Sequence, residues 1–247
     1  MGMSQRLWIV VAAVAAGLIG FTAWYRMQSK PAESAFVPPV PAQAVKPADA
    51  PLPPAAESDA RIRSLLAGAS PRLREWLKED ALLDRWAVLT DNLALDVSPR
   101  KQLAMLAPKA PFRALEKGGR ASVDPRSYQR YDLFADAVAS VDVRAFAAAV
   151  RELHPLLEAA YHKLGYPDRS IDSAVQSALQ RLLDTPVSEA PPALKSKGAL
   201  WQFADERLES LGPVEKHLLR MGPRNTKLIQ AKAREIAAAL DLRLAAH

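Results

Sequence analysis

The 247-residue chain contains no cysteine, only four histidines and few aromatic residues (6%). The absence of cysteine excludes thiol catalysis, disulfide bonds and cysteine-based metal sites, although it does not fix the compartment. The sequence also lacks HExxH, G-x-S-x-G, Walker and G-x-G-x-x-G motifs, which mark common metalloproteases, hydrolases and nucleotide-binding proteins. With 49% hydrophobic and 24% charged residues, most of the chain nevertheless has the composition of a globular protein.

The few side chains suited to catalysis do not form a known constellation. His154 and His162 are eight residues apart, about 12 Å along a helix, which is too far to share a metal ion. Asp205, Glu206 and Glu209 could in principle supply the acid and base of a glycosidase. A charged helix start at a solvated face explains these three carboxylates better. We therefore expect no catalytic residue, no metal site and no cofactor, and we favour a non-enzymatic function.

A long apolar run without any charged residue extends from Leu7 to Tyr25. As a helix it would span about 28 Å, close to the hydrocarbon thickness of a bilayer. Trp8 and Trp24 lie near its ends, as interfacial anchors do. A cleavable signal peptide would have a shorter apolar core and small residues at its cleavage site, whereas this run ends in FTAWYRM. We therefore predict that residues 1–30 form an uncleaved, single-pass anchor whose partner is the lipid bilayer.

The orientation of this anchor does not follow from its flanking charges. Arg6 and the amino terminus nearly balance Arg26 and Lys30. A short head before a long exported body is the usual bacterial arrangement, and it predicts an inner-membrane protein with its C-terminal domain in the periplasm. Residues 31–57 contain eight prolines and read as a linker, because they have too little apolar bulk for a core. At about 3.1 Å per residue, this linker could reach roughly 80 Å.

Residues 58–247 have the pattern of one compact, mainly α multi-helix domain. The spacing of apolar residues predicts helices over 58–67, 71–77, 80–95, 126–138, 143–164, 171–182, 200–211, 213–221 and 223–244. Between the third and fourth of these, two short extended runs flank Lys117-Gly118-Gly119. This arrangement predicts a small β-hairpin near residues 111–123.

Turn and capping residues account for the joints between these helices. We expect Ser58 to cap the first helix and Pro71 to begin the second. In LGYPDRS, Gly165 suits the left-handed end of a helix, and Asp168 or Ser170 can cap the next. In LLRMGPRN, Gly222 ends one helix before Pro223 begins another. The two joints therefore have a structural explanation whether or not they also bind a ligand.

Charge offers a further indication of function. From residue 58 onward, 29 Lys and Arg stand against 24 Asp and Glu, and residues 100–130 hold eight bases against Glu116 and Asp124. Such a stretch could meet anionic lipid headgroups, polyanionic envelope polymers or, in a reversed topology, nucleic acid. It lacks the interleaved aromatics of single-strand binders. We therefore expect no nucleic acid as a partner.

Two cations occupy an unfavourable place in the last helix. Arg224 and Lys227 lie in its first turn, where the backbone dipole disfavours positive charge. An anion near this helix start would relieve the conflict. It could be an external phosphate or carboxylate, or the side chain of Asp132, Asp168 or Asp205.

Four short motifs resemble a known family when they are taken together and in order. These are YQRYD, LGYPDR, FADERLESL and LLRMGPRN, behind an apolar segment and a proline-rich linker. Residues 58–242 are similar to a proteobacterial membrane-anchored domain-of-unknown-function family. The family usually has Asp-Pro where this chain has Asp205-Glu206, which affects only the local helix start. The resemblance implies an inner-membrane protein with a periplasmic helical domain, and it implies no assigned activity.

These observations predict an inner-membrane-anchored, non-enzymatic binding or scaffold module of the bacterial cell envelope. Its partner would be an envelope protein or an anionic envelope ligand. The alternative is an envelope enzyme acting on peptidoglycan or a lipid-linked substrate, which needs a cleft with facing carboxylates. Exposed Tyr and Arg side chains are good interface anchors, and the motif residues supply the predicted binding surface: Tyr128, Arg130, Tyr131, Asp132, Tyr166, Asp168, Arg169, Arg220, Arg224 and Asn225.

Overall fold

The computed structural model describes residues 51–103, 107–198 and 200–245. These residues belong to one compact unit that runs from residue 49 to residue 247. The predicted anchor, Leu7 to Tyr25, and most of the predicted linker lie outside the described residues. Within the described ranges, no helix is both long and apolar enough to cross a membrane.

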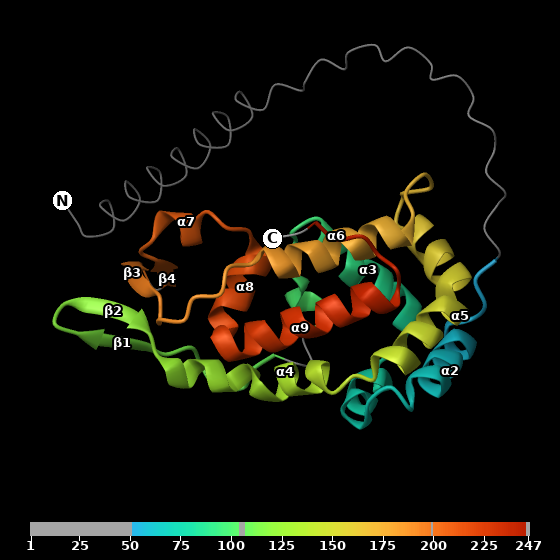
Figure 1. Ribbon diagram of the computed structural model, residues 1–247, viewed down its shortest axis with the longest axis horizontal. Coiled ribbons are helices and arrows are strands. Elements are labelled where there is room, and N and C mark those ends of the chain that lie inside the picture. The colour runs from blue at the N-terminus through green and yellow to red at the C-terminus, as the bar shows by residue number, and fades with distance from the viewer. Residues whose placement is uncertain (1–50, 104–106, 199, 246–247) are drawn as a thin grey trace, which may run out of the picture. The chain divides into compact units, whose positions relative to one another are not determined.

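The body of the described part is helical, as predicted (Figure 1). Its α-helices are α2 (Ala55–Leu66), α3 (Leu82–Ala94), α4 (Asp132–Ala139), α5 (Val143–His162), α6 (Ile171–Asp184), α7 (Glu206–Glu209), α8 (Pro213–Met221) and α9 (Pro223–Ala239). The described residues also form short 3-10 helices: η1 (Pro71–Lys78), η2 (Pro99–Lys101) and η4 (Pro125–Tyr131).

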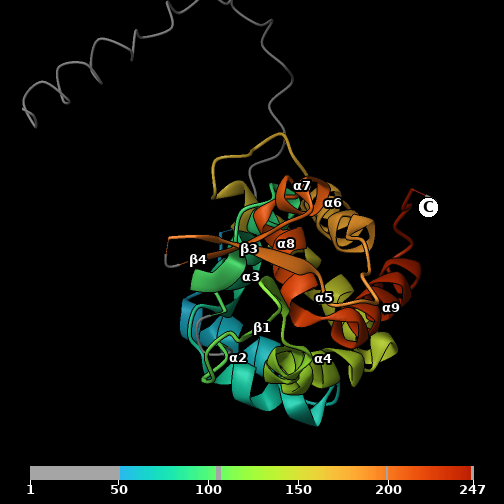
Figure 2. The ribbon, with the colours of Figure 1, turned by 90° about the vertical axis from the view of Figure 1, so that its left-hand side faces the viewer.

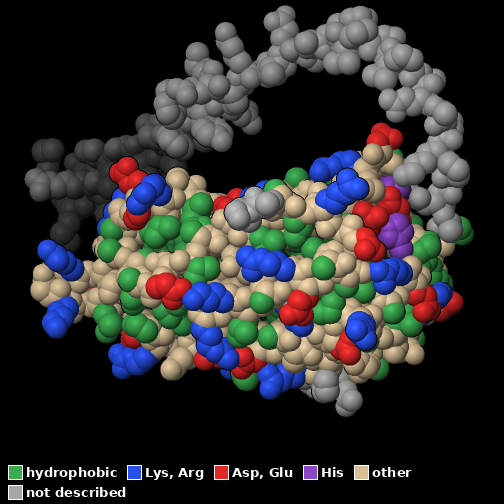
Figure 3. Space-filling view, in the orientation of Figure 1, with side chains coloured by type: hydrophobic (Ala, Val, Ile, Leu, Met, Phe, Trp, Pro, Cys, Tyr) green, Lys and Arg blue, Asp and Glu red, His purple; other side chains and the backbone are tan. Residues whose placement is uncertain are grey.

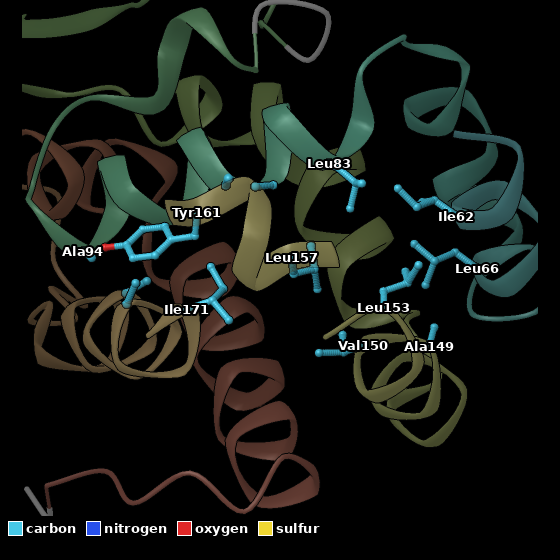
Figure 4. Close-up of a cluster of buried hydrophobic side chains, with 14 of the residues drawn as sticks. Ile62, Leu66, Leu83, Ala94, Ala149, Val150, Leu153, Leu157, Tyr161 and Ile171 are labelled. Atoms are coloured by element: carbon cyan, nitrogen blue, oxygen red, sulfur yellow. The ribbon is translucent and has the colours of Figure 1, made fainter. Parts of the chain in front are cut away.

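The largest core lies where α2, α3, α5 and α6 meet. Leu153, Leu157 and Tyr161 are spaced four residues apart along α5, so they form one face of this helix. All three are fully buried, and Figure 4 shows them among Leu83 of α3 and Ile171 of α6. Fully burying each large aliphatic side chain stabilises the fold by about 1.5–3 kcal/mol.

The first helix begins earlier than the sequence predicts. Ser58 is not its N-cap, because α2 starts at Ala55 after Pro54. Ser58 lies inside the helix, where its hydroxyl donates a hydrogen bond to the Ala55 carbonyl at 2.9 Å. The carbonyl of Pro54 accepts the backbone N–H groups of Glu57 and Ser58, at 3.0 and 3.1 Å. Proline therefore provides the start that a serine cap was expected to provide.

A four-stranded antiparallel sheet lies at one end of the helical body (Figures 1 and 2). Its strands follow the chain order: β1 (Ala114–Lys117), β2 (Arg120–Val123), β3 (Ala193–Lys197) and β4 (Leu200–Phe203). The hairpin β1–β2 confirms the prediction for residues 111–123. The predicted helix over 200–211 is wrong in its first half, because residues 200–203 pair with β3. Phe203 is fully buried against Leu194 and α8 residue Leu219 in a separate core.

The predicted joints have the expected local chemistry. Gly165 has φ +103° after α5, and the Ser170 hydroxyl accepts the Ser173 N–H at the start of α6. Gly222 has φ +83° between α8 and α9. Asp205 caps the short helix α7 by accepting the Arg207 N–H. The departure from Asp-Pro at this place therefore leaves the cap in place.

Candidate functional site

The structure divides the ten predicted site residues into two groups. Tyr166, Asp168 and Arg169 lie at the joint between α5 and α6. The others lie on η4, α4, α8 and α9: Tyr128, Arg130, Tyr131, Asp132, Arg220, Arg224 and Asn225.

The joint between α5 and α6 is organised around two tyrosines. The ring of Tyr166 stacks on the buried ring of Tyr161, with centroids 5.5 Å apart. The hydroxyls of Tyr161 and Tyr166 donate to the Asp91 carboxylate of α3 at 3.4 and 3.5 Å. Burial raises the pKa of Tyr161, so this tyrosine stays neutral. Arg169 lies over Tyr166, 5.2 Å from the ring centroid. Tyr166 therefore packs the joint between α5 and α6 against the largest core.

The start of α9 is held by an internal polar network around Asn225. This side chain is 1% exposed. Its amide nitrogen donates to the carbonyls of Tyr128 and Met221 at 3.1 and 3.0 Å, and to Asp132 at 2.9 Å. Its amide oxygen accepts a hydrogen bond from Arg224 at 2.9 Å. Asn225 thus fills its hydrogen-bonding capacity inside the protein.

Internal acids also account for the two cations at this helix start. Arg224 forms an ion pair with Asp136 at 2.6 Å and approaches Asp132 at 3.7 Å. The hydrogen bond to Asp136 raises the pKa of Arg224. Lys227 pairs with Glu189. Among the internal acids proposed from the sequence, Asp132 therefore takes part, and Asp136 and Glu189 were missed.

The remaining predicted residues surround His217 of α8. The edge of the Tyr131 ring meets His217, with centroids 5.4 Å apart at 81°. Arg130 lies between the rings of Tyr131 and Phe112, at 5.1 and 5.6 Å from their centroids. Its guanidinium donates to the carbonyls of Ser127 and Ala110, at 2.8 and 3.2 Å. The guanidinium of Arg130 is therefore fixed in place by aromatic rings and backbone carbonyls.

Three arginines act together on His217, and we call Arg100, Arg130 and Arg220 the arginine cluster. Burial, followed by the charges of Arg100, Arg220 and Arg130, lowers the pKa of His217 to about 4. Arg220 lies over the Phe203 ring at 5.2 Å. Among the described residues, none of the three forms an ion pair. The cluster is thus a concentration of positive charge without a bonded carboxylate.

Glu209 is an acid whose pKa is lowered by the charge of Arg220, a member of this cluster. Burial raises the pKa of Glu209, but the Phe203 N–H and the charges of Lys216 and Arg220 lower it overall. Its carboxylate already accepts hydrogen bonds from the Phe203 N–H at 2.9 Å and from Lys216 at 3.4 Å. Glu209 therefore offsets the field of Arg220 only in part.

A small cavity of about 140 Å³ lies elsewhere, between α3, α5 and α6. His154 and Asp172 lie in its wall, with Nε2 of His154 3.1 Å from Oδ1 of Asp172. The other lining residues are mainly apolar and include no hydroxyl or thiol side chain. The cavity is also smaller than the pockets of about 300–1,000 Å³ that hold most small ligands. This His-Asp pair therefore has no nucleophile beside it.

The chain matches the model of a known protein family. The model described as "Protein of unknown function (DUF3014)" matches residues 82–237. The chain belongs to the DUF3014 family. No curated protein and no solved structure matches it significantly. The DUF3014 match contains all ten predicted site residues, and it confirms the resemblance to a domain family without an assigned activity.

Within this DUF3014 domain, the sequence interpretation missed His217 as the centre of a cluster. His217 is one of only four histidines, but no motif connects it with Arg100. The two residues are far apart in the sequence, and only the fold brings Arg100 near enough for its charge to lower the pKa of His217. Arg100 does lie in the basic stretch that was identified from charge alone, so charge was the usable signal.

Proposed function

We propose that the domain is a non-catalytic binding module for an anionic ligand of the cell envelope, tethered to the inner membrane by residues 7–25. The observation that carries this proposal is the arginine cluster. Arg130 lies over the Tyr131 ring that contacts His217, and Arg220 follows His217 by one turn of α8. Among the described residues these arginines form no ion pair, and their charges help to lower the pKa of His217. Arginine guanidinium groups bind carboxylates and phosphates through two parallel hydrogen bonds. Both anions are therefore suitable ligands.

The aromatic rings around the cluster hold its arginines in place before a ligand binds, so the binding site is preformed. Arg130 and Arg220 each rest on an aromatic ring, so little side-chain freedom is lost when an anion arrives. His217 stays neutral above pH 4 because burial and the arginines disfavour its protonation. A neutral imidazole leaves the arginines as the charged groups that meet the ligand. No proton transfer is needed, which fits a binding role.

The low pKa of His217 makes the stability of the domain depend on pH. The pKa of His217 falls from its usual 6.5 to about 4 on folding. Between these values the unfolded chain binds more protons than the folded one, so stability rises with pH in this window. An anion in the arginine cluster would favour the imidazolium ion. Ligand binding should therefore raise the pKa of His217.

We expect Arg220→Gln to weaken anion binding by about 10- to 100-fold, since a charge-assisted hydrogen bond contributes about 1.5–3 kcal/mol. Inorganic phosphate and succinate serve as separate probes for phosphate and carboxylate ligands, and calorimetry gives their affinities. Spectra of histidine-labelled protein, assigned with His217→Gln, follow the pKa of His217 with and without each probe. Arg100→Gln, which removes an exposed arginine of the cluster, should weaken binding in the same way.

Arg144→Gln is the matched control, because Arg144 is exposed on α5 and the change removes the same charge. Equal losses of affinity in Arg144→Gln and Arg220→Gln would mean that the affinity depends only on the net charge of the protein. An unchanged His217 pKa at saturating probe would show that the anion binds elsewhere. Either result would remove the arginine cluster as the ligand site.

The tether is tested separately by fusions after His247. A reporter active only in the periplasm should give signal, and one active only in the cytoplasm should not. This expectation rests on the apolar segment from Leu7 to Tyr25. Cytoplasmic signal alone would contradict the topology, while leaving the calorimetric test of the arginine cluster unaffected.

A further inference from the structure

The register of the four-stranded sheet separates its side chains into two faces. Leu194 lies opposite both Ala121 of β2 and Phe203 of β4. These residues belong to the second core with Val123 and Trp201, and so they define the inner face. Successive residues of a strand point to opposite faces. The outer face therefore carries the alternate positions of each strand.

The outer face is basic and partly apolar. By register it carries four cations, Lys117, Arg120, Lys195 and Lys197, together with Leu115 and Leu200. Leu115 is 42% exposed and Leu200 is 72% exposed. Glu116, the acid of these strands, lies opposite Ala121 and therefore on the inner face. Figure 3 shows Lys and Arg side chains at the projecting tip of the β1–β2 hairpin.

The four cations are placed where they repel one another. Lys117 lies directly opposite Arg120. Ala121 pairs with Leu194, so the next residues along these two strands, Arg120 and Lys195, are also neighbours. Like charges directly opposite each other destabilise a sheet. Among the described residues, no carboxylate forms an ion pair with any of the four. The fold alone therefore gives no reason for this arrangement, whereas an anionic partner would.

We propose that this outer sheet face docks on the surface of an anionic phospholipid bilayer. The cations match anionic headgroups, and each Lys or Arg near such a surface strengthens binding about five-fold. Leu115 and Leu200 are exposed among the cations, as required for contact with the acyl boundary. The aromatic residue of β4 beside Leu200, Trp201, lies on the inner face. The outer face thus offers no ring for stacking nucleic-acid bases.

This docking site is distinct from the arginine cluster and does not depend on a ligand there. The proposed tether would raise the local concentration of the sheet face at the membrane. It would thereby hold the domain against the bilayer when headgroups are anionic, and release it when they are not. Docking should also weaken with salt, because surface charges are screened over about 8 Å at physiological ionic strength.

The full chain can be tested in nanodiscs, where both bilayer faces are accessible whatever the orientation of the anchor. Because the chain has no cysteine, Ser122→Cys on the outer face takes a single environment-sensitive dye. Nitroxide-labelled lipid should quench this dye in equal parts phosphatidylcholine and phosphatidylglycerol, but not in phosphatidylcholine alone. In a separate chain, a dye at Thr22→Cys should be quenched in both lipids. Failure of the tether and failure of the docking face are thus distinguished.

Replacing Lys117, Arg120, Lys195 and Lys197 by Gln should lower the docking equilibrium at least about 100-fold and abolish quenching at position 122. The matched control replaces four exposed cations elsewhere, Lys109, Arg144, Arg234 and Arg243, and should retain quenching. Leu200→Ser should give an intermediate loss.

Three results would overturn the proposal. The first is equal quenching at position 122 in both lipids, and the second is an equal loss in the control variant. The third is binding of a DNA oligonucleotide that the quadruple variant loses while phosphatidylglycerol has no effect. This last result would assign the outer face to nucleic acid.

Discussion

Gly222→Ala should lower the free energy of unfolding by about 3 kcal/mol or more, a large loss for the addition of a single methyl group. Gly222 has φ +83°, a conformation that is strained for any residue with a Cβ atom. A Cβ atom here would lie 2.3 Å from Cγ of Tyr128. Tyr128 cannot move away easily, because its own carbonyl accepts a hydrogen bond from buried Asn225. Strain and overlap therefore add.

Denaturant unfolding of Gly222→Ala and Gly165→Ala separates these two contributions. Gly165 has φ +103° but nothing within 4 Å of the place of a Cβ atom. Its replacement should cost only about 1 kcal/mol, from backbone strain alone. Equal losses in the two variants would mean that the Tyr128 ring yields without cost. The contact between Tyr128 and Gly222 would then contribute little to the packing of the segment YQRYD against LLRMGPRN.

Local chemistry explains why most helix boundaries could be predicted from the sequence. Asp142, Ser170 and Gly222 act through their own backbone or through residues a few positions away. Such signals do not depend on the rest of the fold. Apart from the start of α2, which lies three residues before the predicted one, the prediction failed where a partner far away in the sequence determines the structure. Residues 200–203 are a strand because residues 194–197 pair with them, while β2 pairs with the other edge of β3, and pairing of this kind overrides local helical preference.

The candidate sites show the same division between local and long-range signals. Motif residues could be identified from the sequence, but their separation into a polar network and an arginine cluster could not. That separation depends on which acids lie nearby: Arg224 meets Asp136, whereas Arg220 meets the ring of Phe203. The outer sheet face brings Lys117 and Arg120 beside Lys195 and Lys197 through pairing of β2 with β3. A list of charges along the chain contains no information about this pairing.

Asn225→Leu should also destabilise the domain strongly, by about 3 kcal/mol, because it removes the centre of the polar network. The leucine side chain is similar in size, so the change leaves little cavity. The carbonyls of Tyr128 and Met221 lose the side-chain donor they share, and Arg224 loses one acceptor. An unsatisfied buried polar group costs about 1–3 kcal/mol. Denaturant unfolding measures the total.

Asn92→Leu provides the comparison, since Asn92 is only half-buried and, among the described residues, its side chain donates one hydrogen bond, to Gln102 at 2.9 Å. We expect it to cost about 1 kcal/mol or less. Calorimetry with phosphate on folded Asn225→Leu then separates a structural from a binding role. An unchanged affinity would agree with a structural network beside the arginine cluster. A loss of affinity with little loss of stability would instead make Asn225 a ligand contact, and the site would extend from Arg220 to the start of α9.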